Sequence, residues 1–122
     1  FDAPTRRLRL ALETRIRNLG IASGLAYLDS LLPSFPQGLP EEVLNRLGYR
    51  LLSVGQVSAA VTIFHRNAEA YPNSSNAYDS LGEACAAAGD TSGAIANYRR
   101  SLALDPTNQN AVRMLARLGA SP

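Results

Sequence analysis

EEVLNRLGYRLLSVGQVSAAVTIFHRNAEAYPNS (residues 41–74) is followed directly by SNAYDSLGEACAAAGDTSGAIANYRRSLALDPTN (residues 75–108), and the two stretches align without a gap. Each is 34 residues long. The matched positions are Leu47-Gly48 with Leu81-Gly82, Gly55 with Gly89, Ala60 with Ala94, Phe64 with Tyr98, and Pro72 with Pro106. A fixed period of about 20 to 50 residues is typical of repeat architectures, so we predict two copies of one structural unit.

The apolar residues within each copy have helical spacing. In the first copy one face holds Leu44, Leu47, Leu51 and Leu52, and another holds Val57, Ala60, Val61 and Phe64. Gly55 and Gly89 fall where the chain would bend between two helices, and Pro72 and Pro106 fall where the second helix would end. Oxygen-bearing side chains that could cap the next helix follow at Asn73, Ser74, Ser75, Thr107 and Asn108. Each copy is therefore predicted to be a helix pair.

This length and this order of Leu-Gly, Gly, Ala, Phe or Tyr, and Pro resemble the tetratricopeptide repeat family. The resemblance implies an all-α fold of helical hairpins stacked in a right-handed superhelix. The sequence departs from the family pattern at the opening aromatic, which is Leu44 in one copy and Tyr78 in the other. It departs again at the later aromatic of the first helix, which is Leu51 or Cys85.

The repeat extends in both directions. Upstream, Gly24, Leu28 and Pro36 have the spacing of Ala60, Phe64 and Pro72, and an apolar stripe of Leu8, Leu12, Ile16 and Leu19 precedes them. Downstream, Val112 and Leu115 would face the stack as part of a C-terminal capping helix. We therefore predict one helical repeat domain over residues 1–122, with a degenerate repeat at 5–36, repeats at 41–74 and 75–108, and a capping helix at 109–119.

Composition indicates a soluble chain. Its 122 residues are 46% apolar, and the longest apolar run has five residues, whereas a membrane span needs about 20. We expect no membrane partner, and the compartment stays open between cytoplasm and periplasm. The chain starts at Phe1 and lacks a signal peptide's apolar segment, so we interpret it as a fragment or a processed chain.

The resemblance implies that the first helix of each pair lines a concave surface that binds a protein or peptide partner. On that mapping the candidate partner-binding residues are Asn45, Arg46, Tyr49, Asn76, Asp79, Glu83, Arg113 and Arg117, with Glu42, Ser80 and Asn110 also exposed beside them. Asn45 and Tyr49 are the preferred contacts because an amide can bind a peptide backbone and a tyrosine combines apolar area with a polar tip.

Asp79 and Glu83 lie one turn apart, and the equivalent positions of the next helix are Arg113 and Arg117. We expect these four residues to form a ladder of ion pairs, and we favour a structural role for it over binding of a partner's carboxylates. A lysine and asparagine clamp for acidic chaperone tails is disfavoured because the chain has no lysine.

A second resemblance leaves an alternative open. The segment from Tyr78 to Ala84, with Tyr71-Pro72-Asn73-Ser74 and 44–49, is similar to tail segments of bacterial serine hydrolases of the β-lactamase-like and esterase classes. This implies an accessory or dimerisation module whose catalytic centre lies in another domain.

Nothing in the sequence predicts catalysis, a cofactor or a metal site. Cys85 is expected to be a buried, inert thiol, and His65 a surface residue without a second ligand at metal-binding spacing. The arginines of residues 6–17 form a local basic patch with Glu13, but they lack interleaved aromatics and the net charge is only +2. We therefore expect a solvated or domain-docking face and no nucleic-acid partner.

Overall fold

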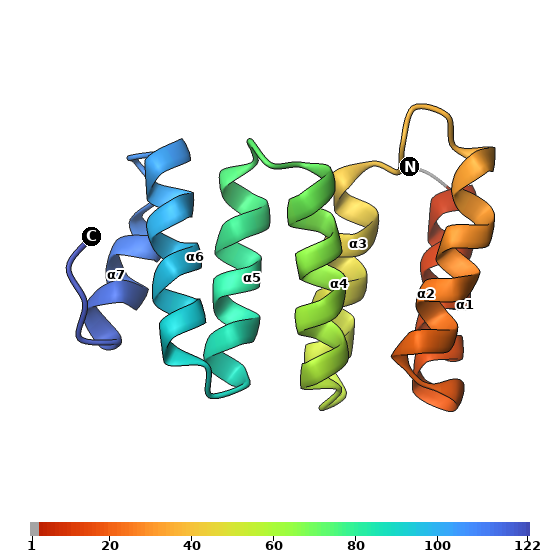
Figure 1. Cartoon of the computed structure of the whole chain (residues 1–122), viewed down its shortest axis with the longest axis horizontal. Helices are drawn as coiled ribbons and strands as arrows, with labels where there is room; N and C mark the ends of the chain where they lie inside the picture. Colours follow the sequence, from red (N-terminus) through yellow and green to blue (C-terminus); the bar gives the residue numbers. More distant parts are fainter. Residues whose placement is uncertain (1–2) are drawn as a thin grey trace. The chain divides into compact units, whose positions relative to one another are not determined.

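The computed structural model describes residues 3–122, and every regular element in that range is a helix (Figure 1). The bounds are α1 (Ala3–Leu19), α2 (Ile21–Leu31), the 3-10 helix η1 (Leu32–Ser34), α3 (Glu41–Ser53), α4 (Val57–Ala70), α5 (Ser75–Ala87), α6 (Thr91–Leu104) and α7 (Gln109–Arg117). The predicted all-α class is confirmed. Phe1 and Asp2, which the predicted domain includes, lie outside the described residues.

The chain divides between Ile63 and Phe64 into two compact units. The prediction of a single domain stays a prediction. In the first unit, α1 packs against both α2 and α3, and η1 packs against α2. The unit's core is formed by fully or almost fully buried side chains of these helices, namely Leu12, Ile16, Leu28, Leu47 and Leu51.

Close contact between α1 and α2 depends on a glycine. Gly24 of α2 lies against the side chain of Ile16, and a Cβ atom at Gly24 would overlap the Ile16 Cγ1 atom. The predicted apolar stripe is buried at Leu8, Leu12 and Ile16, but it is wrong at Leu19, which is 67% exposed. Leu19 is the last residue of α1, and the chain turns at once into α2 through Gly20, so no further turn of helix covers it.

An ion pair joins α1 to α3. Glu13 is only 6% exposed, and its Oε2 atom accepts hydrogen bonds from Arg17 Nη1 at 3.3 Å and from Arg50 Nε at 3.0 Å. A buried carboxylate is costly unless it is paired, and here two guanidinium groups supply the pairing. The predicted solvated face is therefore wrong at Glu13, which belongs to the interface between the two helices.

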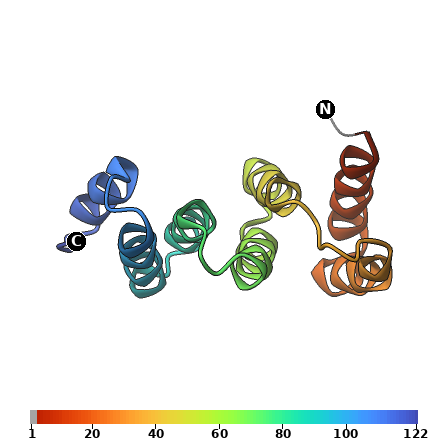
Figure 2. The same cartoon turned by 90° about the horizontal axis from the view of Figure 1, so that it is seen from above.

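The second unit holds the hairpin of α5 and α6, with α7 packed against α6 (Figure 2). Tyr98 of α6 is 0% exposed and lies over Gly82 of α5, where an added Cβ would stand 3.1 Å from ring carbons. Leu115 of α7 is also fully buried, and Val112 is half-buried. The predicted capping helix thus packs its apolar face inward.

Turns and helix starts follow the predicted signals closely. Gly55 and Gly89 have φ values of 81° and 80°, a left-handed conformation that glycine adopts at little cost. The side chains of Ser74 and Asn108 accept hydrogen bonds from Ala77 N at 3.1 Å and Ala111 N at 3.2 Å. Asp90, which sequence reasoning did not single out, caps α6 through Gly93 N at 2.9 Å.

Candidate partner-binding surface

The first unit presents three of the candidate residues on one helix, α3. Asn45 and Tyr49 lie one turn apart and are half-buried, and Arg46 is exposed. Arg50 stands one turn after Arg46, and its Nε atom is bound to Glu13. This helix therefore presents an amide, a phenol ring and a guanidinium group that is not held by the ion pair with Glu13.

In the second unit, α5 and α7 are joined by a network centred on Asp79. Asn110 Nδ2 lies 3.1 Å from Asp79 Oδ1 and 3.0 Å from Oδ2, and Asn108 Nδ2 lies 3.1 Å from Oδ1. The Asp79 carboxylate is half-buried and is held by two neutral amides. The predicted ion-pair ladder is wrong at this residue, because the short side chain of Asn110 takes the place expected for Arg113.

The other candidates of the second unit surround this network. Asn76 and Glu83 on α5, and Arg113 and Arg117 on α7, are all exposed. Arg117 Nη1 lies 3.9 Å from the Met114 sulfur atom, a contact within its own helix. The exposed residues of the two helices thus offer an amide, a carboxylate and guanidinium groups around one fixed carboxylate.

A serine and asparagine network lies beneath this surface. Ser101 Oγ donates to Ser75 O at 2.8 Å, and Asn108 Nδ2 lies 2.8 Å from Ser101 Oγ. Asn108 thereby caps α7 with its oxygen and joins α5, α6 and α7 with its nitrogen. The sequence suggested Asn108 as a cap, but its second role depends on partners that only packing brings together. Ser80 is 0% exposed, so its predicted place on the surface is wrong.

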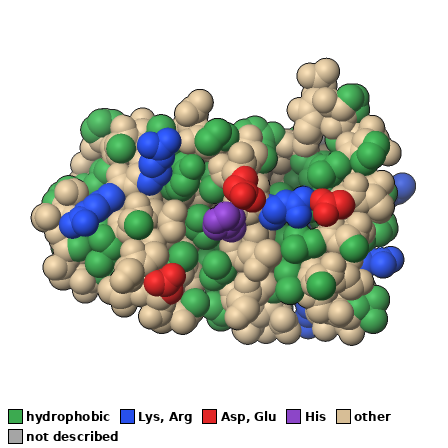
Figure 3. Space-filling model, viewed as in Figure 1, with side chains coloured by type: hydrophobic (Ala, Val, Ile, Leu, Met, Phe, Trp, Pro, Cys, Tyr) green, Lys and Arg blue, Asp and Glu red, His purple; other side chains and the backbone are tan. Residues whose placement is uncertain are grey.

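Cys85 and His65 lie as the sequence predicts. Cys85 is buried, and burial is the main reason that its pKa is raised, with the Asp90 charge adding to the rise and the Asn97 hydrogen bond opposing it. The single histidine, purple in Figure 3, is exposed, and its Nδ1 atom lies 3.6 Å from Glu69 Oε1. A protonated thiol below the surface is a poor nucleophile.

Two features of residues 3–122 bear on other functions. No group of three or more His, Cys, Asp or Glu side chains in this range is arranged to hold a metal ion. None of the helices described has both the length and the apolar character needed to cross a membrane.

Comparison with known proteins places the fold. Residues 75–118 match a family model described as tetratricopeptide repeat. No curated protein matches the chain. A crystal structure of MamA protein is similar, with a TM-score of 0.64 and 20% identity over 96% of this chain and 63% of that one. The D159K mutant of MamA is similar with a TM-score of 0.61 and 24% identity, over 97% of this chain and 63% of that one.

A third structure, Naa15/Naa10 bound to HypK-THB, has a TM-score of 0.62 and 17% identity over 95% of this chain and 17% of the other. The chain spans less than two thirds of the length of the two MamA structures. Together the match and the likenesses show a tetratricopeptide-type fold of packed helical hairpins. Modules of this type typically bind other proteins and are generally not catalytic. None of these comparisons supports the serine hydrolase alternative.

Proposed function

We propose that the chain is a protein-interaction module that binds a protein or peptide partner through the exposed faces of its first helices. The predicted contacts are Asn45, Arg46 and Tyr49 of α3 in the first unit, and Asn76, Glu83, Arg113 and Arg117 of α5 and α7 in the second. Asp79 is reassigned from partner contact to organiser of this surface, because its carboxylate is already engaged by Asn108 and Asn110.

The observation that carries the proposal is the fixed arrangement of α5 and α7. Three hydrogen bonds from two asparagines to Asp79 hold the exposed groups of both helices in one geometry. A surface fixed before binding loses less conformational entropy when a partner docks. The mixture of amide, carboxylate and guanidinium groups suits a peptide, whose backbone both donates and accepts hydrogen bonds.

The test compares the exposed face of α5 and α7 with the exposed face of α6. Partner retention on the immobilised chain is measured for Asn76→Ala with Arg113→Glu, and for Arg99→Glu on α6, whose side chain is also exposed. We expect the first variant to reduce retention of a discrete partner at least tenfold, since it removes one donor and reverses one charge. Arg99→Glu should retain it. Circular dichroism confirms that each variant remains helical, and loss of the partner only in Arg99→Glu would contradict the proposal.

A further inference from the structure

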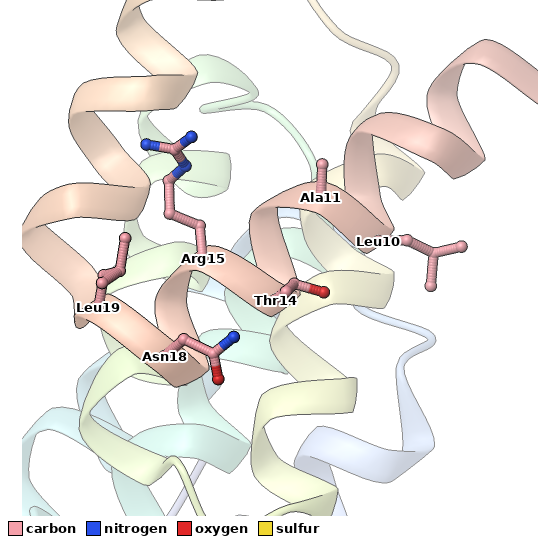
Figure 4. A pocket seen from close by; sticks show the side chains of 6 residues that line it. All are labelled: Leu10, Ala11, Thr14, Arg15, Asn18 and Leu19. Carbon is pink, nitrogen blue, oxygen red and sulfur yellow. The ribbon is translucent and has the colours of Figure 1, made fainter.

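The outward face of α1 carries an open apolar hollow that none of the described residues of the first unit fills (Figure 4). Its six lining side chains all come from this helix, and we name them the α1 face: Leu10, Ala11, Thr14, Arg15, Asn18 and Leu19. Leu10 and Leu19 are 45% and 67% exposed, and they are the exposed large hydrophobic residues of the described chain. Exposed apolar residues gathered in one hollow are typical of an interaction site.

The stripe of α5 that corresponds to the α1 face is buried. Ala11 and Arg15 stand nine and five residues before the turn glycine Gly20, and Ser80 and Ala84 stand nine and five residues before the turn glycine Gly89. On α5 these two positions are 0% exposed, whereas on α1 both are exposed. On α3 the residues nine and five before the turn glycine Gly55 are Arg46 and Arg50, and both are exposed, so this stripe is buried on α5 and open on α1 and α3.

The charges on α1 indicate what kind of partner helix would suit the α1 face. Five arginines lie on α1, and the helix's one acid, Glu13, is buried and paired with Arg17 and Arg50. Arg7 stands one turn before Leu10 and Ala11. The Arg15 guanidinium carbon lies 4.3 Å from the centre of the Tyr27 ring, a cation–π contact that holds this charge at the rim of the hollow. The acids of α2 and α3 in the described part of this unit, namely Asp29, Glu41 and Glu42, do not line it.

We propose that the α1 face docks an amphipathic helix of a partner protein, with an apolar stripe against Leu10, Ala11 and Leu19 and acidic residues facing Arg7 and Arg15. Small side chains at Ala11 and Thr14 leave the space between the two leucines that an apolar residue of the partner would enter. A second copy of this chain fits poorly through α1 against α1 or α1 against α7, because α1 would then meet its own arginines or Arg113 and Arg117.

The experiment titrates the isotope-labelled chain with two synthetic helical peptides and follows amide shifts by nuclear magnetic resonance. Both peptides carry the same leucine stripe, flanked by glutamates in one and by lysines in the other. We expect the glutamate peptide to give saturating shifts at Ala11, Thr14, Asn18 and Leu19 and to bind at least tenfold more tightly than the lysine peptide. Equal affinities, no saturation, or shifts confined to other helices would overturn the proposal.

Variants provide matched controls. Leu10→Ser with Leu19→Ser, and separately Arg15→Glu, should each weaken the glutamate peptide at least tenfold. Arg100→Glu is the control, since Arg100 is also exposed and also lies over a tyrosine ring, that of Tyr78 at 5.6 Å. It should leave affinity unchanged. Sedimentation equilibrium without peptide tests the remaining occupant: self-association that the two serine substitutions abolish would assign the face to a second copy and overturn the proposal.

Discussion

The hairpins α1–α2 and α5–α6 reach close helix contact by opposite arrangements. In α5–α6 the glycine is on the first helix, where Gly82 receives the ring of Tyr98. In α1–α2 the glycine is on the second helix, where Gly24 receives the side chain of Ile16. Protein interiors are packed to a nearly constant density, so packing constrains the combined volume of the two side chains at a helix contact. The large side chain can therefore lie on either helix of a hairpin, provided that the other helix carries the small one.

The two units also fix their first helices differently. Glu13 of α1 is held by charged arginines, one of them on α3, whereas Asp79 of α5 is held by neutral amides, one of them on α7. Each carboxylate lies where two helices meet and accepts hydrogen bonds there from both of its partners. The attraction between Glu13 and its arginines is weakened by salt. The hydrogen bonds from the asparagines to Asp79 depend instead on short side chains that lie close to it.

The largest effect is expected from removing the ring that fills the α5–α6 contact. Tyr98→Ala should lower the free energy of unfolding of the second unit by about 3–5 kcal/mol, because it removes a fully buried aromatic side chain and leaves a cavity over Gly82. Denaturant-dependent hydrogen exchange of α5 and α6 amides measures this loss. A cost below about 1 kcal/mol would mean that the ring does not carry the contact.

A double-mutant cycle tests the contact between Gly24 and Ile16. Gly24→Ala should cost a net of about 1–3 kcal/mol, since the new methyl group overlaps Ile16 and outweighs alanine's helix preference of about 1 kcal/mol. In an Ile16→Ala background the cost should disappear, because the overlapping atoms are gone. Gly82→Ala is the comparison and should cost less, since its closest contact is 3.1 Å. Equal cost of Gly24→Ala in both backgrounds would contradict the packing.

Salt should change the stabilising effect of Glu13 but have little influence on that of Asp79. Glu13→Gln is expected to cost about 1 kcal/mol at low salt and less at high salt, because Arg17 and Arg50 are about half exposed and their attraction is screened. Asp79→Asn should cost about 0.5–1.5 kcal/mol with little salt dependence, since its donors are neutral. Urea unfolding at two salt concentrations makes the comparison, and the same salt dependence for both variants would contradict it.

The smallest effect concerns the buried thiol of Cys85, which lies near the end of α5. Asp90→Asn keeps a capping oxygen at α6 but removes a charge that helps raise the pKa of Cys85, so the pKa should fall slightly while burial keeps it elevated. The pH dependence of alkylation measures it. Because the folded pKa is raised, the thiol's stabilising contribution is present below the unfolded pKa and is lost as pH rises through the folded value. A higher pKa in the variant would contradict this assignment.

The sequence was sufficient for the architecture because the repeat period depends on local features. Turn glycines at Gly55 and Gly89, and caps at Ser74 and Asn108, act within a few residues of themselves. Long-range partners were not predictable in the same way. Glu13 is buried because Arg50, which lies 37 residues away, reaches it.

The candidate surface was predicted in part for the same reason. Helical spacing alone identifies Asn76, Arg113 and Arg117 as exposed, since they lie in the middle of outward faces. Ser80 was placed on the outward face by the same spacing, but it is fully buried, and the repeat pattern does not predict this burial. The choice of Asn110 over Arg113 as the partner of Asp79 depends on side-chain length, which a repeat pattern does not specify.

Site-specific photo-crosslinking tests the central claim, binding through first-helix faces, most directly. A benzoylphenylalanine residue is placed at Asn76 or Arg113, and at Ala96 of α6, which is also exposed, as the control. In cells of the source organism, the account predicts a discrete crosslinked partner from positions 76 and 113 and none from position 96. A partner captured from position 96 alone would contradict it and assign binding to the second helices.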